Sequence, residues 1–238
     1  MKRILDPVFI AASLALLSCI LGRAQTSAIT EALPELDVHV GLNLNVRLVF
    51  QNKRMLEDSG LVGTELGPSI ELYLNPIRIL KEITLFNLDD TKSVPLTMSI
   101  GYRALLYPGE STTRRIEPVV GVHLPFWGHI LITDQNRADL DRTGDSFDWR
   151  YRNRLSAERS IRIHSYLPRP YASVELFHTS KYAKWSNTRL YVGCLLPLAQ
   201  HLSLDPYFEH DNNTGPRPNQ QINAGGFIVN LYFPRQKK

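Results

Sequence analysis

Three arginines in the second half of the chain alternate with aromatic and apolar residues. Arg150, Arg152 and Arg154 are two positions apart within residues 147–155. In a β-strand, residues two apart lie on the same face, so this spacing brings three guanidinium groups together. Such groups repel one another unless carboxylates neutralise them. The block therefore predicts either a structural ion-pair network or an anion-recognising constriction, since rings of charged side chains select ions in pores.

Charged residues at alternating positions elsewhere in the chain supply the partners that such a network needs. Our first interpretation is a set of ion pairs that fills the narrow lumen of a barrel. The predicted members are Arg47, Glu65, Glu71, Arg103, Arg150, Arg152, Arg154, Glu175, Arg189 and Glu209. Further candidate partners are Glu117, Asp148 and Asp205.

The signals for catalysis are weak. The sequence holds no H-E-x-x-H, C-x-x-C, P-loop or G-x-S-x-G motif. His178 and Ser180 form the H-x-S part of the H-x-S-N arrangement of membrane-barrel lipid hydrolases, but Lys181 stands where the asparagine belongs. A strand would place both side chains on one face, as nucleophilic catalysis needs. We therefore expect no enzyme and assign no catalytic residue, with a lipid hydrolase as an alternative.

No metal or cofactor site is expected either. Glu209, His210 and Asp211 are potential ligands in one run. Adjacent residues of a strand point to opposite faces, so only Glu209 and Asp211 converge.

The elements that must carry these residues are β-strands, because apolar residues occupy every second position along most of the chain. In residues 37–50 the valines, leucines and Phe50 share one face, while Asp37, His39, Asn43, Asn45 and Arg47 share the other. The same alternation recurs in residues 62–74, 96–106, 120–126, 147–155, 172–176, 189–196, 202–209 and 226–233. We expect about ten to twelve strands in one antiparallel, up-and-down meander.

Turn signals separate these runs. The predicted turns fall at residues 57–60, 87–92, 108–109, 136–145 and 211–219. Residues 77–86 are ambiguous and could form a short helix, because Pro76 suits a first helical turn.

Alternation alone fits both a soluble barrel or sandwich and an outer-membrane barrel. Three features favour the membrane barrel. Several runs extend over about 12 to 14 residues, which is enough for a tilted crossing. The polar face mixes Gly, Asn, Ser, Arg and Glu, as a crowded lumen does, and aromatic residues gather near the ends of the runs. The last predicted strand ends on Leu231, Tyr232 and Phe233, which resembles the signal read by the barrel assembly machinery, although residues 234–238 follow and Phe233 is not terminal.

The N-terminus predicts export. Lys2 and Arg3 precede an apolar stretch at residues 8–21, and small residues precede a cleavage position after Ala24. We expect a signal peptide at 1–24 and a β-barrel domain at 25–238, with lipidation of Cys19 as a second route. Removal of residues 1–24 lowers the formal net charge from +4 to +2, so no nucleic-acid partner is expected.

The second half resembles an uncharacterised bacterial family, domain of unknown function family 2490. The resemblance rests on the W-R-x-R-x-R-L block at residues 149–155, on residues 169–177 and 187–193, and on the closing segment at 205–210. It implies an outer-membrane-type β-barrel without an established activity, and so carries over no catalytic residue.

Together these patterns predict an outer-membrane β-barrel with a polar, ion-paired lumen and a structural or passive pore-like role. The expected partners are outer-membrane lipids, the barrel assembly machinery and a small solute or anion. An exported soluble β-barrel that binds a small ligand is the other alternative.

Overall fold

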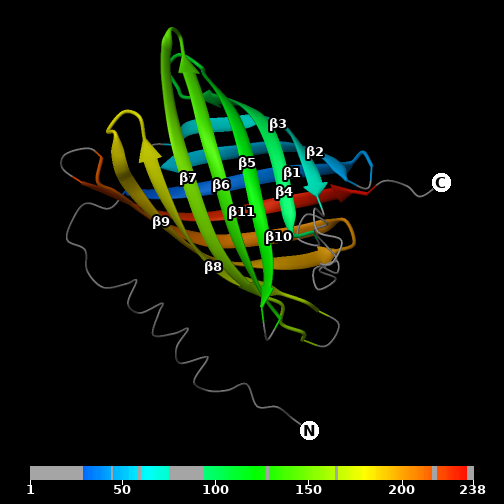
Figure 1. The fold of residues 1–238 in the computed structure, drawn as a ribbon. Coiled ribbons are helices and arrows are strands. Elements are labelled where there is room, and N and C mark those ends of the chain that lie inside the picture. The colour runs from blue at the N-terminus through cyan, green and yellow to red at the C-terminus, as the bar shows by residue number, and fades with distance from the viewer. Residues whose placement is uncertain are drawn as a thin grey trace.

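The computed structural model describes residues 29–43, 45–57, 60–74, 94–126, 129–163, 166–215 and 219–234. The predicted signal peptide, Cys19 and residues 77–86 lie outside these ranges. Within them, eleven strands form one closed β-barrel (Figure 1). The strands are β1 (Ile29–Gly41), β2 (Val46–Glu57), β3 (Gly60–Leu74), β4 (Leu96–Leu106), β5 (Thr113–Phe126), β6 (Ile130–Thr143), β7 (Ser146–Arg159), β8 (Arg169–Thr179), β9 (Lys184–Ala199), β10 (Leu202–Asn213) and β11 (Gln220–Phe233). No helix of these ranges is long and apolar enough to cross a bilayer.

The barrel closes between its first and last strands. Each strand pairs with its sequence neighbours in antiparallel fashion, but β1 pairs with β11 in parallel, from Ile29 opposite Ile222 to Val40 opposite Phe233. The all-β barrel and its predicted strand number are confirmed, whereas a wholly antiparallel sheet is wrong. An odd number of up-and-down strands makes the first and last strands run in the same direction, so their pairing is parallel. The start of β1 and the end of β11 therefore lie at opposite ends of the barrel.

Apolar side chains cover the outer wall of the barrel. The alternation of the sequence places one side chain of every adjacent pair outside, and these are mostly large and exposed. Ile100 is 57 % exposed and Phe126 is 62 % exposed. Others with the same outward orientation are Leu36, Phe50, Ile70, Leu72, Met98, Leu124, Leu155, Leu176, Leu190, Val192, Phe208 and Phe227.

Charged side chains fill the inner face. Arg103, Arg115, Asp139, Glu175 and Glu209 are all at most 5 % exposed, although each carries a formal charge. Ordinary soluble proteins bury such residues only when they are paired. The barrel thus has its polar residues inside and its apolar residues outside, which inverts the arrangement of a soluble barrel.

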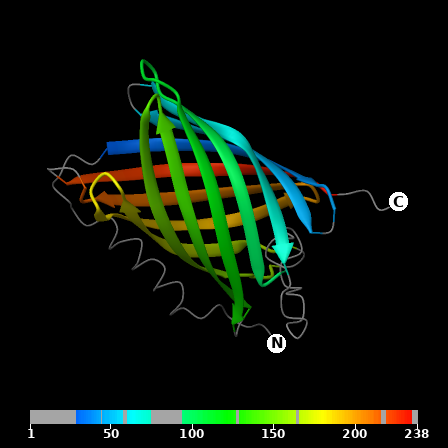
Figure 2. The same cartoon turned by 45° about the horizontal axis from the view of Figure 1, so that its top comes forward.

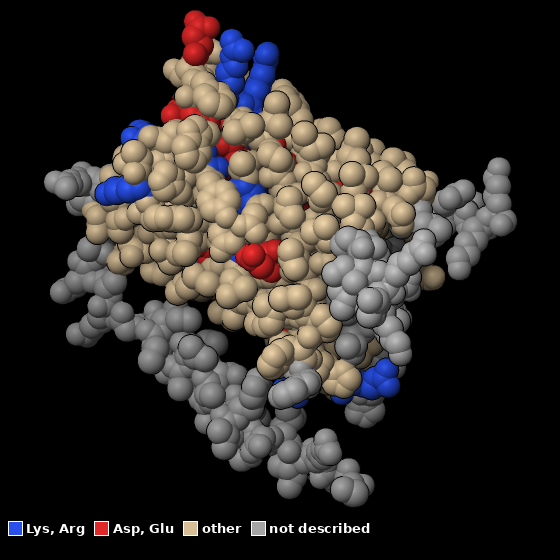
Figure 3. All heavy atoms as spheres, in the orientation of Figure 1, with Lys and Arg blue, Asp and Glu red and all other residues tan. Residues whose placement is uncertain are grey.

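Polar side chains interrupt the outer wall in the middle of β6 and β7. Asp134 accepts hydrogen bonds from Nδ2 of Asn153 at 2.7 Å and from Nδ2 of Asn136 at 3.3 Å, and Tyr151 donates to Asn136. Elsewhere on the face that Figure 3 shows, most of the wall carries no charge, and charged atoms gather where the β6–β7 hairpin projects.

The turn predicted at residues 136–145 is wrong. Residues up to Thr143 continue β6, and the connection to β7 consists of Gly144 and Asp145 alone. Gly144 has a φ of 59°, in the left-handed region that glycine enters without steric cost. The segment mimics a turn because Asn, Asp and Arg dominate its composition, although Ala138 and Leu140 keep the period of two.

The interior also holds an apolar cluster. Leu33, Tyr191, Tyr207 and Ala224 pack together inside the barrel, with contributions from β1, β9, β10 and β11. Figures 1 and 2 show β4–β7 as one wall of the barrel, with β1, β10 and β11 on the opposite wall. Within the lumen we name two inner surfaces by their charge: the arginine wall consists of the inner faces of β5–β10, and the seam wall consists of the inner faces of β11, β1 and β2.

Candidate functional site: the charged lumen

The arginine row of β7 points into the barrel. Arg150, Arg152 and Arg154 share the inner face of the strand, as their spacing predicts, and Trp149 and Leu155 share the outer face. Arg152 is the most buried of the three arginines, at 7 % exposed. Because buried guanidinium groups must be neutralised, the neighbouring strands have to provide carboxylates.

Asp139 of β6 is the first of these carboxylates. It is fully buried and lies directly opposite Arg150 in the register of the two strands. Its Oδ2 lies 2.6 Å from Nη2 of Arg150 and 3.5 Å from Nη1 of Arg152, and its Oδ1 contacts Arg137. One carboxylate thus stands between three arginines.

Glu175 of β8 serves the other end of the row. Its Oε1 lies 2.8 Å from Nη2 of Arg152, and its Oε2 lies 3.0 Å from Nη2 of Arg154. The hydroxyl of Tyr191 donates to Glu175 at 3.3 Å and accepts a hydrogen bond from Arg154 at 3.0 Å. These contacts bind β7, β8 and β9 together across the lumen face.

Arg189 extends the network to β10. Its Nε lies 3.0 Å from Oε1 of Glu209, and its Nη2 lies 2.7 Å from Oδ2 of Asp211. Its Nη1 also donates to the hydroxyl of Tyr191 at 3.2 Å. The Tyr191 hydroxyl therefore links the Arg189 group to the β7 row.

The aromatic ring of Phe177 packs between three guanidinium groups. Phe177 of β8 is 2 % exposed and has Cζ of Arg152 4.7 Å from its ring centroid. Arg189 and Arg150 lie at 5.1 Å and 5.5 Å from the same centroid. Cation–π attraction of this kind strengthens when the pair is shielded from water. Phe177 thus separates like charges and also attracts them.

The network continues toward β3 and β4. Nε of Arg115 lies 2.6 Å from Oδ1 of Asp141, and its Nη1 lies 3.6 Å from Oε2 of Glu65. Glu117 contacts Arg115, Arg137 and Arg103, the last at 3.5 Å. Nη1 of Arg103 also donates to the carbonyl oxygens of Gly67 and Pro68, which fixes the guanidinium against β3.

The structure places all ten predicted lumen residues on the inner face. Eight of them belong to the continuous chain of contacts described above, and Arg47 and Glu71 form an ion pair of their own at 2.7 Å. The candidate partner Glu117 joins the network, whereas Asp148 lies at an exposed end of β7. Asp205 of β10 accepts a hydrogen bond from the hydroxyl of Tyr171 at 3.3 Å.

Sequence reasoning missed Arg137, Asp139 and Asp141, because it assigned them to a turn. These residues alternate with Ala138 and Leu140 along β6, and that period of two was the available signal. The omission of Asp139 removed the carboxylate that Arg150 and Arg152 share from the prediction, whereas Glu175, the partner of Arg152 and Arg154, was included.

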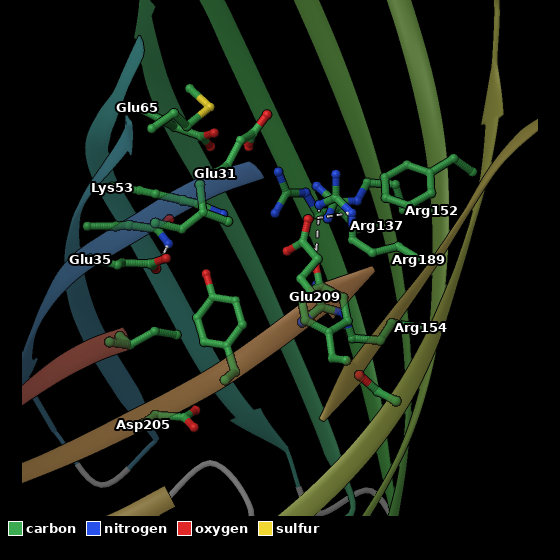
Figure 4. A pocket seen from close by; sticks show the side chains of 18 of the residues that line it. Glu31, Glu35, Lys53, Glu65, Arg137, Arg152, Arg154, Arg189, Asp205 and Glu209 are labelled. Carbon is green, nitrogen blue, oxygen red and sulfur yellow. Dashed lines mark hydrogen bonds and ion pairs between the residues drawn. The ribbon is translucent and has the colours of Figure 1, made fainter. Parts of the chain in front are cut away.

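A cavity of about 470 Å³ lies between the arginine wall and the seam wall. Figure 4 shows Arg137, Arg152, Arg154 and Arg189 on one side, and Glu31, Glu35 and Lys53 on the other. A space of this size admits several waters or one small solute. The site can therefore hold a small polar molecule.

His178 and Ser180, the hydrolase alternative, contact different partners. The His178 ring stacks on Trp149 with centroids 5.5 Å apart and meets Trp185 edge to face. The Ser180 hydroxyl accepts the backbone N–H of Trp149 at 3.0 Å and donates to Asp148 at 3.4 Å. These contacts account for both residues as parts of the β7–β8–β9 rim.

Comparisons with protein families and with curated proteins find no match to this chain. The resemblance to domain of unknown function family 2490 therefore stays a prediction.

Proposed function

We propose that the protein is an outer-membrane β-barrel with a structural, passive pore-like role for small solutes. The observation that carries this proposal is the inverted polarity of the barrel. Its apolar side chains face outward around the wall, while its arginines and carboxylates are buried inside. That arrangement suits a barrel with lipid around its outer wall and water within its lumen.

The outer wall of the barrel has a different free energy in water and in lipid. An exposed Leu, Ile or Phe side chain forgoes about 1.5–3 kcal/mol of burial free energy when it stays in water. More than twenty large apolar side chains of the described residues are exposed, most of them on this wall. Soluble monomers rarely expose contiguous apolar patches beyond a few hundred Å². Lipid hydrocarbon recovers that free energy, and an aqueous compartment does not.

The network supports the structural part of the role. It ties β3 to β10 through side chains as well as through backbone pairing. Charged contacts of this number hold the inner wall in one arrangement beside the cavity. The pore-like part rests on that cavity, which is lined by charged as well as apolar side chains.

The membrane partners follow from the same placement. Outer-membrane lipids would contact the apolar wall, and the barrel assembly machinery would insert the chain. The outward Phe233 at the end of β11 stands where the assembly signal is expected.

Two measurements test the proposal. Cell fractionation with gel mobility before and after heating tests the location. We expect the protein in the outer-membrane fraction, with faster migration of the unheated barrel. Release as a soluble, detergent-independent monomer contradicts the proposal. Planar-bilayer recordings test the pore-like role, for which we expect small, steady conductance steps, and a silent bilayer after verified insertion contradicts that part.

A further inference from the structure

The arginines that line the cavity add little net charge to it, because carboxylates match them. Arg137, Arg150 and Arg152 share Asp139, and Arg152 and Arg154 share Glu175. Within the described residues, the seven arginines of the network contact seven carboxylates: Glu65, Glu117, Asp139, Asp141, Glu175, Glu209 and Asp211. The arginine wall as a whole is close to neutral.

The seam wall that faces it carries surplus carboxylate. Glu31 and Glu35 of β1 line the cavity, and Lys53 of β2 is the one cationic residue that the described seam wall adds to the lining. The side-chain amide of Gln51, which is neutral, donates a hydrogen bond to Glu35. Lys53 lies opposite Glu35 in the β1–β2 register, so a single ammonium group faces two carboxylates.

At the edge of the arginine wall, one buried carboxylate oxygen accepts no hydrogen bond from the described residues. Glu31 lies opposite Ala224 of β11, and Ala224 lies opposite Glu209 of β10, so two inward carboxylates flank one small side chain. Glu209 is 3 % exposed, and its Oε1 pairs with Arg189. Its Oε2 is buried and accepts no hydrogen bond. An unsatisfied buried carboxylate oxygen is costly, and an entering cation relieves that cost.

We propose that the solutes admitted by the lumen are small cations, such as alkali-metal and primary ammonium ions, and not the anions that the arginine block suggests. The inference rests on the proposed pore-like role and names its substrate class. Cations pass along β1, where Glu31, Glu35 and Oε2 of Glu209 offer oxygen ligands. Anions meet guanidinium groups that already bind carboxylates, so little positive charge remains to compensate the loss of water, although Nε of Arg154 has no hydrogen-bond partner among the described residues.

The test is the ion selectivity of the full-length barrel in planar bilayers under a potassium chloride gradient. We expect a reversal potential of the sign for cations, with a potassium-to-chloride permeability ratio on the order of 3, because a charged cleft raises the local counter-ion concentration. The double variant Glu31→Gln, Glu35→Gln removes both charges at nearly constant volume. We expect its permeability ratio to fall toward 1.

Asp134→Asn is the matched control. It removes the same charge per site from the outer wall and leaves the lumen untouched, so its permeability ratio should equal that of the parent barrel. Heat-dependent gel mobility verifies that each variant is folded.

The outcomes separate the two proposals. Conductance with anion selectivity, or an unchanged ratio in the double variant, overturns the cation assignment and leaves the pore-like role standing. A silent bilayer with folded, inserted protein overturns the pore-like role and the cation assignment together.

Discussion

The two walls of the lumen accommodate polar side chains inside the barrel in different ways. The arginine wall buries many formal charges, and each guanidinium there has a carboxylate within 4 Å. The seam wall lines the cavity with Leu33, Met55 and Ile228 as well as Glu31 and Glu35, and no arginine joins them there. Ion pairs cross-link the arginine wall. The seam wall is packed by apolar contacts, and the cavity lies beside it.

The difference shows where charge is structural in this barrel. Removal of one partner from a dense, buried network leaves other charges stranded. Removal of a carboxylate that faces the cavity leaves no charge without its partner, since Glu31 forms no ion pair with any residue in the described part of the chain. Mutations in the two walls should therefore separate into effects on stability and effects on solutes.

Asp139→Asn should have the largest effect on stability. It leaves Arg137, Arg150 and Arg152 without their shared carboxylate, and breaking a buried pair in this way costs about 3–5 kcal/mol. Urea unfolding in detergent micelles, followed by tryptophan fluorescence, measures this loss. Asp134→Asn on the outer face of the same strand is the control and should change the free energy of unfolding by less than about 1 kcal/mol. Equal effects from the two variants would contradict the structural role of the network.

Gly226→Ala should give the next largest effect, on the seam wall. A methyl group at this inward position of β11 overlaps the ring of Tyr207, which lies over the glycine. Overpacking of this kind costs about 1–3 kcal/mol. The neighbouring Gly225 has open space around its Cβ position, so Gly225→Ala should be close to neutral in the same unfolding experiment. A neutral Gly226→Ala would mean that the seam wall is not packed as described.

Arg150→Ala should destabilise the barrel by about 1 kcal/mol, less than loss of its partner. Arg150 is the more exposed member of its pair, and Asp139 keeps Arg137 and Arg152. Thermal melts in detergent should show a lower midpoint. Arg142→Ala, near the projecting hairpin, provides the comparison and should leave the midpoint within error. Unchanged melting of the Arg150 variant would argue against a structural role for this arginine.

Glu31→Gln should have the smallest effect on stability, within about 0.5 kcal/mol, because no ion pair is lost. The same melts check this value. A loss as large as that of Arg150→Ala would place Glu31 in the structural network and erase the contrast between the walls.

The sequence predicted the strands well because the barrel has only two environments. Alternation along residues 226–233 is visible without knowledge of any partner strand. The single strand predicted over residues 37–50 is wrong, because β1 ends at Gly41 and β2 begins at Val46. The alternation continues through this hairpin connection and so hides it. The partners of the arginines were harder, because contacts such as Arg154 with Glu175 depend on the β7–β8 register. Asp139 was missed for a local reason: Asn136, Asp139 and Asp141 look like turn residues in a segment dominated by Asn, Asp and Arg. The parallel seam depends on an exact strand count, which the predicted range of ten to twelve left open.

The substitution Ile100→Lys tests most directly whether the outer wall faces lipid. Ile100 lies near the middle of β4, points outward and is 57 % exposed. In a bilayer, a lysine on the lipid face near the midplane costs about 2–4 kcal/mol. We therefore predict that unfolding measured in phospholipid vesicles shows this loss, or that the variant fails to insert. A variant that is as stable as the parent protein, and more soluble without detergent, would contradict the account.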